Sequence, residues 1–327
     1  MKNRPVNERV FNVLFTVAVL FFFVSDFFLI DSGIENNRVF VISTLLMATI
    51  TVSVYVMVER CFLFPSHSIL LPILTLFLIS LFPESLYQYK VNIVSLILIW
   101  ALYFNMKFVI EERGFGALFI SSMLLTIAAF IVPQLVWLIP FFLLLSLYYA
   151  DFNPRVAVVT IAGILTPVIY LTAYRFIIGE EVNIGVLTDI FLPAFQITAD
   201  SPFSVFSMEM LMLSVMLIAF LIAGGYTLIN DRKQRVKMAL ALNMTLFTVV
   251  ALLIIIFLFY MGSPELSFVL VSPCISILLF NIFKSSMSMK MTRIVCYIFI
   301  ILTILIRIAD VVSIDRISGW IFHLPYE

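Results

Sequence analysis

Long apolar runs separated by short polar gaps dominate this sequence, and most of its basic residues lie in every second gap. The runs are about 16–27 residues long and lack the polar alternation of a membrane β-strand. Because a hydrocarbon layer offers no water to unpaired backbone groups, only helices or closed barrels cross it. The pattern predicts an all-α, polytopic transmembrane helical bundle that forms a single integral membrane domain, residues 1–327.

Each crossing of the hydrocarbon core needs roughly 20 apolar residues. We expect about eleven spans, near residues 10–30, 39–58, 64–83, 91–110, 115–132, 134–150, 156–178, 203–230, 238–261, 266–284 and 292–312. Residues 114–150 carry no charge, and Pro133 and Gln134 mark a turn within them, with a kink expected at Pro140. This segment either crosses twice or forms a re-entrant hairpin, which would leave nine crossings.

The distribution of Lys and Arg predicts the orientation, because cytoplasmic segments of membrane proteins are enriched in both. With the N-terminus inside, 14 basic residues are cytoplasmic and five lie outside or at outer span ends, and the C-terminus is outside. Thirteen of the 19 acidic residues fall on the outer side, which leaves that face net negative. The longest connection, residues 179–202, is also outside. Its mixture of acidic and apolar residues predicts a short amphipathic element on the outer interface.

Residue patterns that bind cofactors or metals do not occur in the sequence. It has no Gly-x4-Gly-Lys loop and no GxGxxG, so we expect no nucleotide cofactor. His67 and His323 fall on opposite sides and cannot share a metal. Cys61, Cys274 and Cys296 form no CxxC and are expected to be free thiols. The basic loops are already explained by membrane orientation, so we expect no nucleic-acid partner.

Charged residues at membrane depth are the first candidates for function. Arg307 is the deepest, and Asp310 follows it at i+3 on the same helix face, so the two are expected to pair. The pair is either a structural ion pair or a substrate contact that opens outward. Arg175 lies at the outer boundary. Asp26 and Asp31, at the end of the first span, are candidate general bases towards a lipid-linked substrate, with Arg175 and Arg307 as phosphate contacts. The alternative for the acids is a solvated acidic face.

The segment IVPQLVWLIPFFLLLSLYY, followed by AGILTPVIYLTAYRF, resembles a bacterial domain-of-unknown-function family of multi-pass inner-membrane proteins. The similarity is carried by the proline-containing hairpin, Gly163, Pro167 and Tyr174-Arg175, over about 60 residues. It implies the inner membrane of a Gram-negative envelope and supplies no activity. The chain is more loosely similar to membrane glycosyltransferases with an acid in the first outer loop. Here that loop, about residues 31–38, is too short for their membrane-lying helices.

Three functional hypotheses follow. The first is an envelope-assembly protein that acts on or beside lipid-linked glycans at the outer face. The second is a non-enzymatic scaffold for other membrane proteins, and the third is a transporter or flippase. The acidic outer face favours the first over the third, and the nearly charge-free middle of the membrane argues against an ion-coupled transporter. The lack of a catalytic motif favours the scaffold. The expected partners are the lipid bilayer, a lipid-linked substrate and other membrane proteins.

Overall fold

The computed structural model describes residues 13, 16–21, 34–61, 69–80, 89–110, 114–179, 191–195, 236–259, 264–284 and 301. These residues are helical apart from short turns and include no strand, which confirms the all-α prediction for this part of the chain. The helices are α2 (Ile34–Arg60), α3 (Leu70–Ser80), α4 (Tyr89–Ile110), α5 (Phe115–Ile131), α6 (Leu138–Tyr149), α7 (Pro154–Ile178), α11 (Val236–Phe259) and α12 (Pro264–Lys284), with two 3-10 helices, η2 (Pro133–Trp137) and η3 (Leu192–Phe195).

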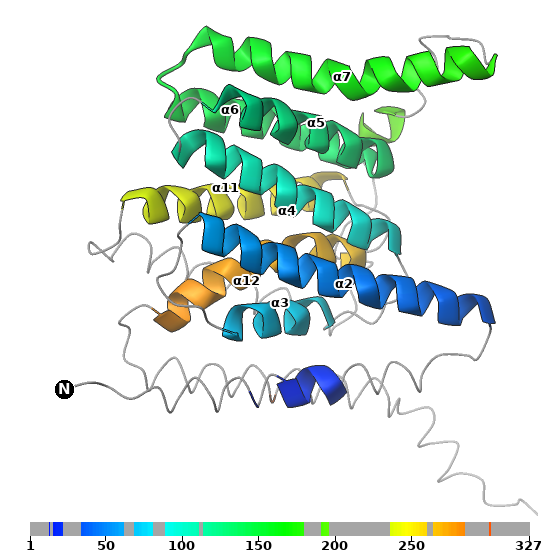
Figure 1. Ribbon diagram of the computed structural model, residues 1–327, viewed down its shortest axis with the longest axis vertical. Helices are drawn as coiled ribbons and strands as arrows, with labels where there is room; N and C mark the ends of the chain where they lie inside the picture. Colours follow the sequence, from blue (N-terminus) through cyan, green and yellow to red (C-terminus); the bar gives the residue numbers. More distant parts are fainter. Residues whose placement is uncertain are drawn as a thin grey trace, which may run out of the picture.

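The eight α-helices pack in two layers, and α12 is inclined to α2 and α4 (Figure 1). One layer has the order α7, α5, α4, α2, and the other has the order α6, α11, α12, α3. From α2 to α7 each helix runs opposite to the one before it, and α12 runs opposite to α11 (Figure 1). These helices therefore begin and finish towards one of two ends of the bundle. We call these the Arg60 end, where α2 finishes, and the Arg38 end, near which α2 begins.

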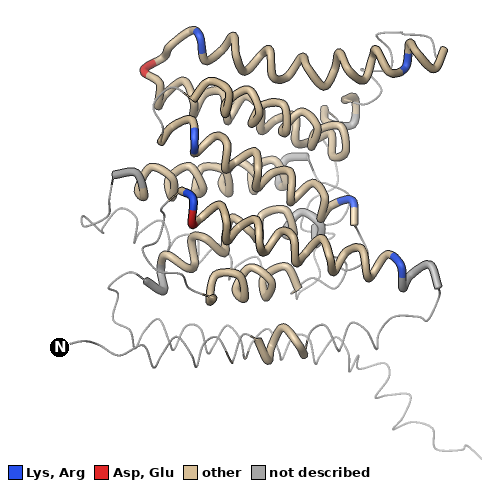
Figure 2. The backbone as a smooth tube through the Cα atoms, viewed as in Figure 1, with Lys and Arg blue, Asp and Glu red and all other residues tan. Residues whose placement is uncertain are grey.

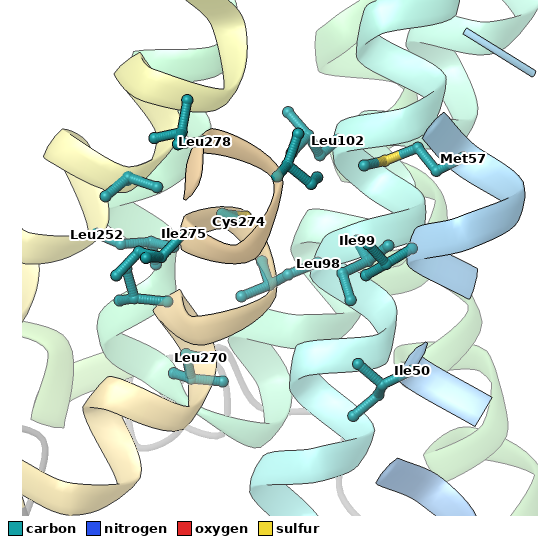
Figure 3. Packing of buried hydrophobic residues seen from close by; sticks show 14 of the residues in the cluster. Ile50, Met57, Leu98, Ile99, Leu102, Leu252, Leu270, Cys274, Ile275 and Leu278 are labelled. Carbon is teal, nitrogen blue, oxygen red and sulfur yellow. The ribbon is translucent and has the colours of Figure 1, made fainter. Parts of the chain in front are cut away.

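Helix α12 is the most deeply buried of the described helices. Every residue from 269 to 281 is buried, because α12 packs against α3 and α11 in its own layer and against α2 and α4 in the other. A helix that is apolar on nearly all sides belongs in such a position. Leu98 and Leu102 of α4 and Met57 of α2 pack around it (Figure 3). Pro273 lies within α12, which continues past it.

Helix α7 lies at the edge of the bundle and packs mainly against α5 and α6 among the described helices. Its buried residues, Val156, Thr160, Gly163 and Pro167, follow a spacing of four, three and four, which is one stripe of a helix. Most of the remaining surface of α7 is exposed and apolar. The helix is unbroken through both Gly163 and Pro167, so neither residue marks a helix end.

The charge-free segment 114–150 forms the antiparallel pair α5 and η2–α6, with the predicted turn at Pro133. Pro140 is the third residue of α6, where a missing N–H breaks no helical hydrogen bond, and α6 continues to Tyr149. At about 1.5 Å per residue, the 17 residues of α5 extend about 26 Å. Because a hydrocarbon core is about 30 Å thick, the choice between two crossings and a re-entrant hairpin stays open.

Four described helical segments are long and apolar enough to cross a membrane: Arg38–Arg60, Tyr89–Ile110, Pro154–Ile178 and Met238–Ile256. Leu70–Ser80, Phe115–Ile131, Pro133–Tyr149 and Val269–Asn281 are apolar but shorter. Each of these eight segments falls on a predicted span. The predicted span 203–230 lies outside the described residues, as do most of 10–30 and all of 292–312 except residue 301. The number of crossings therefore stays a prediction.

Candidate functional site

The charged residues of the described helices lie at the two ends of the bundle (Figure 2). Each is within five residues of a helix terminus, and the helical stretches between carry none. An anionic ligand that binds the described part of the protein would therefore meet basic side chains at an end of the bundle. A ligand between the helices would meet only neutral polar groups there.

Three helices carry a basic residue near both termini, and the separations are similar. Arg60 follows Arg38 by 22 residues, Lys107 follows Lys90 by 17, and Arg175 follows Arg155 by 20. At about 1.5 Å per residue these separations are about 33, 26 and 30 Å. They bracket the roughly 30 Å thickness of a hydrocarbon core, so the charge-free layer of the bundle has the thickness of a membrane interior.

Of the five predicted site residues, only Arg175 lies in the described part of the chain. Asp26, Asp31, Arg307 and Asp310 lie outside it, so their expected proximity and the Arg307–Asp310 pair stay predictions.

Arg175 is in the last turn of α7, at the Arg38 end, and is partly buried. Gly179 ends the helix in the left-handed conformation, with φ 83°, and donates its N–H to the carbonyls of Arg175 and Phe176. A cation near the carboxyl end of a helix is stabilised by the helix dipole, which is a structural reason for Arg175. Tyr170 and Tyr174 are exposed on the same part of α7. Such amphipathic rings suit a membrane–water boundary.

Part of the longest connection folds back onto the hairpin at the Arg38 end. The Trp137 indole N–H donates to the carbonyl of Ala194 at 2.9 Å, which joins η2 to η3. Phe195 packs edge-on against the Trp137 ring at a centroid distance of 5.4 Å, and Phe191 contacts Phe130 at 5.7 Å. Ala194 is fully buried by these contacts. We call Trp137, Phe191, Ala194 and Phe195 the hairpin cap. Within the predicted interfacial element 179–202, residues 191–195 are thus anchored to the bundle.

Neutral polar side chains join the buried helices. Thr75 of α3 and Ser276 of α12 share a hydrogen bond at 2.8 Å, and Ser272 donates to the carbonyl of Leu78 at 3.4 Å. These two contacts fix the antiparallel register of α3 and α12. Hydroxyl groups also bond to carbonyls of their own helices, as Thr75 does to Leu71, which allows them to be buried in an apolar core.

The sequence pattern did not single out the buried asparagines, which include Asn105 and Asn281. Asn105 of α4 is 0% exposed and accepts a hydrogen bond from the Ser146 hydroxyl of α6 at 3.2 Å. Asn281 of α12 is 2% exposed. The side-chain N–H2 groups of both asparagines have no hydrogen-bond partner among the described residues. The sequence signal was an uncharged amide inside an apolar run, which a search for charged residues alone does not detect.

The described residues include no cluster of side chains that could bind a metal ion. No group of three or more His, Cys, Asp or Glu side chains comes together in the described ranges. Cys61 and Cys274 are buried and form no disulfide, as expected, whereas Cys296 lies outside the described residues.

The chain matches no protein-family model, no curated protein and no solved structure. The resemblance of the hairpin and the seventh predicted span to an inner-membrane family therefore stays a prediction.

Proposed function

We propose that the chain is a multi-pass protein of a bacterial inner membrane, with the Arg60 end in the cytoplasm and the Arg38 end outside. Support comes from the charge-free layer between the basic residues of α2, α4 and α7, which is about as thick as a hydrocarbon core. The alternating direction of the helices from α2 to α7 fits repeated crossings. The 14-to-5 distribution of basic residues over the whole sequence supports the orientation.

We also propose that the protein takes part in envelope assembly, acting on or beside lipid-linked glycans at the Arg38 end. The observation that carries this proposal is the composition of α7. The exposed apolar surface of α7 suits contact with a hydrocarbon chain. Arg175 lies in the last turn of the helix, close to the exposed side chains of Tyr170 and Tyr174. A lipid-linked glycan has the same order of groups, a long apolar chain and then a phosphate. Arginine is the side chain best suited to bind phosphate oxygens in pairs.

The acidic residues Asp26 and Asp31 remain the candidate general bases in this proposal. Asp31 is the better candidate of the two, because it is expected to be the better hydrated and hence ionised. The hairpin cap holds part of the longest outer connection at the same end of the bundle as Arg175.

A non-enzymatic scaffold is the second candidate, and the same helix favours it. The exposed apolar surface of α7 runs along a 25-residue helix at the edge of the bundle and is free to pack against a helix of another membrane protein. In that case Ile161 and Leu165, which are exposed midway along α7, would contact the partner and the charge of Arg175 would matter little.

The experiment compares Arg175→Gln with Arg155→Gln, which removes the basic residue from the opposite end of the same helix. Both variants are expressed at matched levels in a strain that depends on the protein, and surface glycan is quantified. The lipid-linked-glycan proposal expects a loss of glycan in Arg175→Gln and in Asp31→Asn but not in Arg155→Gln. Normal glycan in a clean deletion strain would exclude it. The scaffold would be favoured if surface glycan were lost in the deletion strain and in Ile161→Trp but stayed normal in Arg175→Gln and Asp31→Asn.

A further inference from the structure

The two halves of α7 differ in how they pack against the bundle. The first half, residues 154–167, contains all of the buried residues of the helix. Within it, Gly163 lies so close to α5 that an added Cβ atom would be 2.6 Å from the carbonyl oxygen of Phe119. In the second half, residues 168–178, every residue is exposed or half-buried. We call this second half the distal segment. Packing on α5 holds the first half in place, whereas the distal segment buries no residue.

Pro167 lies at the junction between the two halves. Because proline has no N–H, the carbonyl of Gly163 lacks the helical hydrogen bond that residue 167 would otherwise donate. Beside it, the Thr166 hydroxyl donates to the carbonyl of Ala162 at 2.8 Å, and side-chain bonds of this kind bend helices. Figure 1 shows α7 bending near its middle and extending past the end of α5. The helix backbone is therefore least supported where the burial of α7 ends.

We propose that Pro167 is a hinge and that the distal segment of α7 swings about it relative to the bundle. Movable elements have few buried contacts, and a hinge lies where a few residues absorb the change in backbone angles. Both conditions are met at Pro167. At about 1.5 Å per residue, Ala173 lies about 9 Å beyond Pro167, so a swing of about 20° displaces it by about 3 Å.

The distal segment carries the side chains to which the proposed function assigns contact with a lipid headgroup. Arg175 lies in its last turn, and Tyr170 and Tyr174 are exposed along it. A swing about Pro167 moves these three side chains together relative to the hairpin cap. The consequence for the ligand rests on the proposed function: a phosphate bound by Arg175 selects one position of the distal segment, because a ligand favours the state that it binds more tightly.

The first test measures distances between paired spin labels in lipid nanodiscs, in a protein whose native cysteines have been replaced. Leu45→Cys on α2 is the common reference, paired either with Ala162→Cys before the hinge or with Ala173→Cys after it, and all three positions are exposed. The distance distribution of the Ala173 pair should be broader than that of the Ala162 pair by about 3 Å. Equal widths for the two pairs would overturn the proposal.

Pro167→Ala distinguishes a hinge from fraying of the helix end. It supplies the N–H that the Gly163 carbonyl can accept, so the distribution of the Ala173 pair should narrow to the width of the Ala162 pair. Pro140→Ala is the matched control, because Pro140 lies in the first turn of α6, where an added N–H closes no helical hydrogen bond. The control should leave both widths unchanged. An equally broad Ala173 distribution in Pro167→Ala would contradict the hinge.

The link to phosphate binding has a separate test, in which a polyprenyl phosphate is added to the nanodiscs. The Ala173 distribution should narrow in the otherwise unmodified protein and stay broad in Arg175→Gln. A distribution that stays broad in both proteins would show that the hinge does not serve phosphate binding. Normal surface glycan in the deletion strain would instead exclude the role in envelope assembly and leave the distance measurements as the test of the hinge.

Discussion

Gly163 lies where α7 packs closely against α5, and it offers a quantitative test of the packing. A Cβ atom at this position would lie 2.6 Å from the carbonyl oxygen of Phe119 and still closer to the Ser122 hydroxyl. The Phe119 oxygen belongs to the backbone of α5, so Gly163→Ala must push α7 away from α5. Overpacking of this kind costs about 1–3 kcal/mol, while the better helix propensity of alanine returns up to about 1 kcal/mol. We expect a net loss of about 1–2 kcal/mol.

Gly116 supplies the matched control, because a Cβ atom added there meets nothing within 4 Å. Gly116→Ala should therefore leave stability unchanged or raise it slightly. The assay is thermal unfolding of the purified protein in detergent, where Gly163→Ala should lower the midpoint by several degrees. Adding Ser122→Ala to Gly163→Ala should restore part of the lost stability, because it removes the hydroxyl group that the new Cβ atom meets. The restoration should be incomplete, because the contact with the Phe119 carbonyl remains. A Gly163→Ala protein as stable as the Gly116→Ala protein would refute the close packing of α7 on α5.

Three further predictions concern single hydrogen bonds. A double-mutant cycle with Thr75→Val and Ser276→Ala should give a coupling of about 0.6–1.7 kcal/mol in unfolding experiments, and an additive cycle would contradict their bond. Trp137→Phe keeps an aromatic ring but removes the N–H group that donates to the carbonyl of Ala194. Limited proteolysis should then cleave the 179–202 connection faster than in the unmodified protein, and an unchanged rate would contradict the hairpin cap. Asn153→Ala removes the side-chain oxygen that caps the first turn of α7 and should cost about 0.5–2 kcal/mol, measured as a lower midpoint than in Asn153→Ser.

Hydropathy predicted the helices well because the length of an apolar run determines where a helix can lie in an apolar environment. The predicted segment 91–110 lies within α4, and 39–58 lies within the longer α2. Hydropathy did not predict which helix is central. The sequence of α12 is less apolar than those of α3 and α11. Its burial comes from contacts with α11 and with α2, α3 and α4, which are distant in sequence.

The candidate site was predicted only in part, for a related reason. Charged residues are visible in an apolar sequence, so Arg175 was identified and lies at a helix end as expected. Asn105 and Asn281 were not identified, because an uncharged amide is common at the surface and becomes informative only when the fold buries it. Likewise, the bond from Trp137 to Ala194 joins residues 57 positions apart, and no local pattern indicates it.

The most direct test of the central claim places one cysteine at each end of α7 in a protein whose native cysteines have been replaced. Asp151→Cys lies in the exposed turn before the helix, and Ile178→Cys lies at its exposed last residue. In intact cells, a membrane-impermeant thiol reagent should label Ile178→Cys, and Asp151→Cys should be labelled only after the inner membrane is opened. Labelling of both positions in intact cells, or of neither until the membrane is opened, would contradict a membrane crossing by α7.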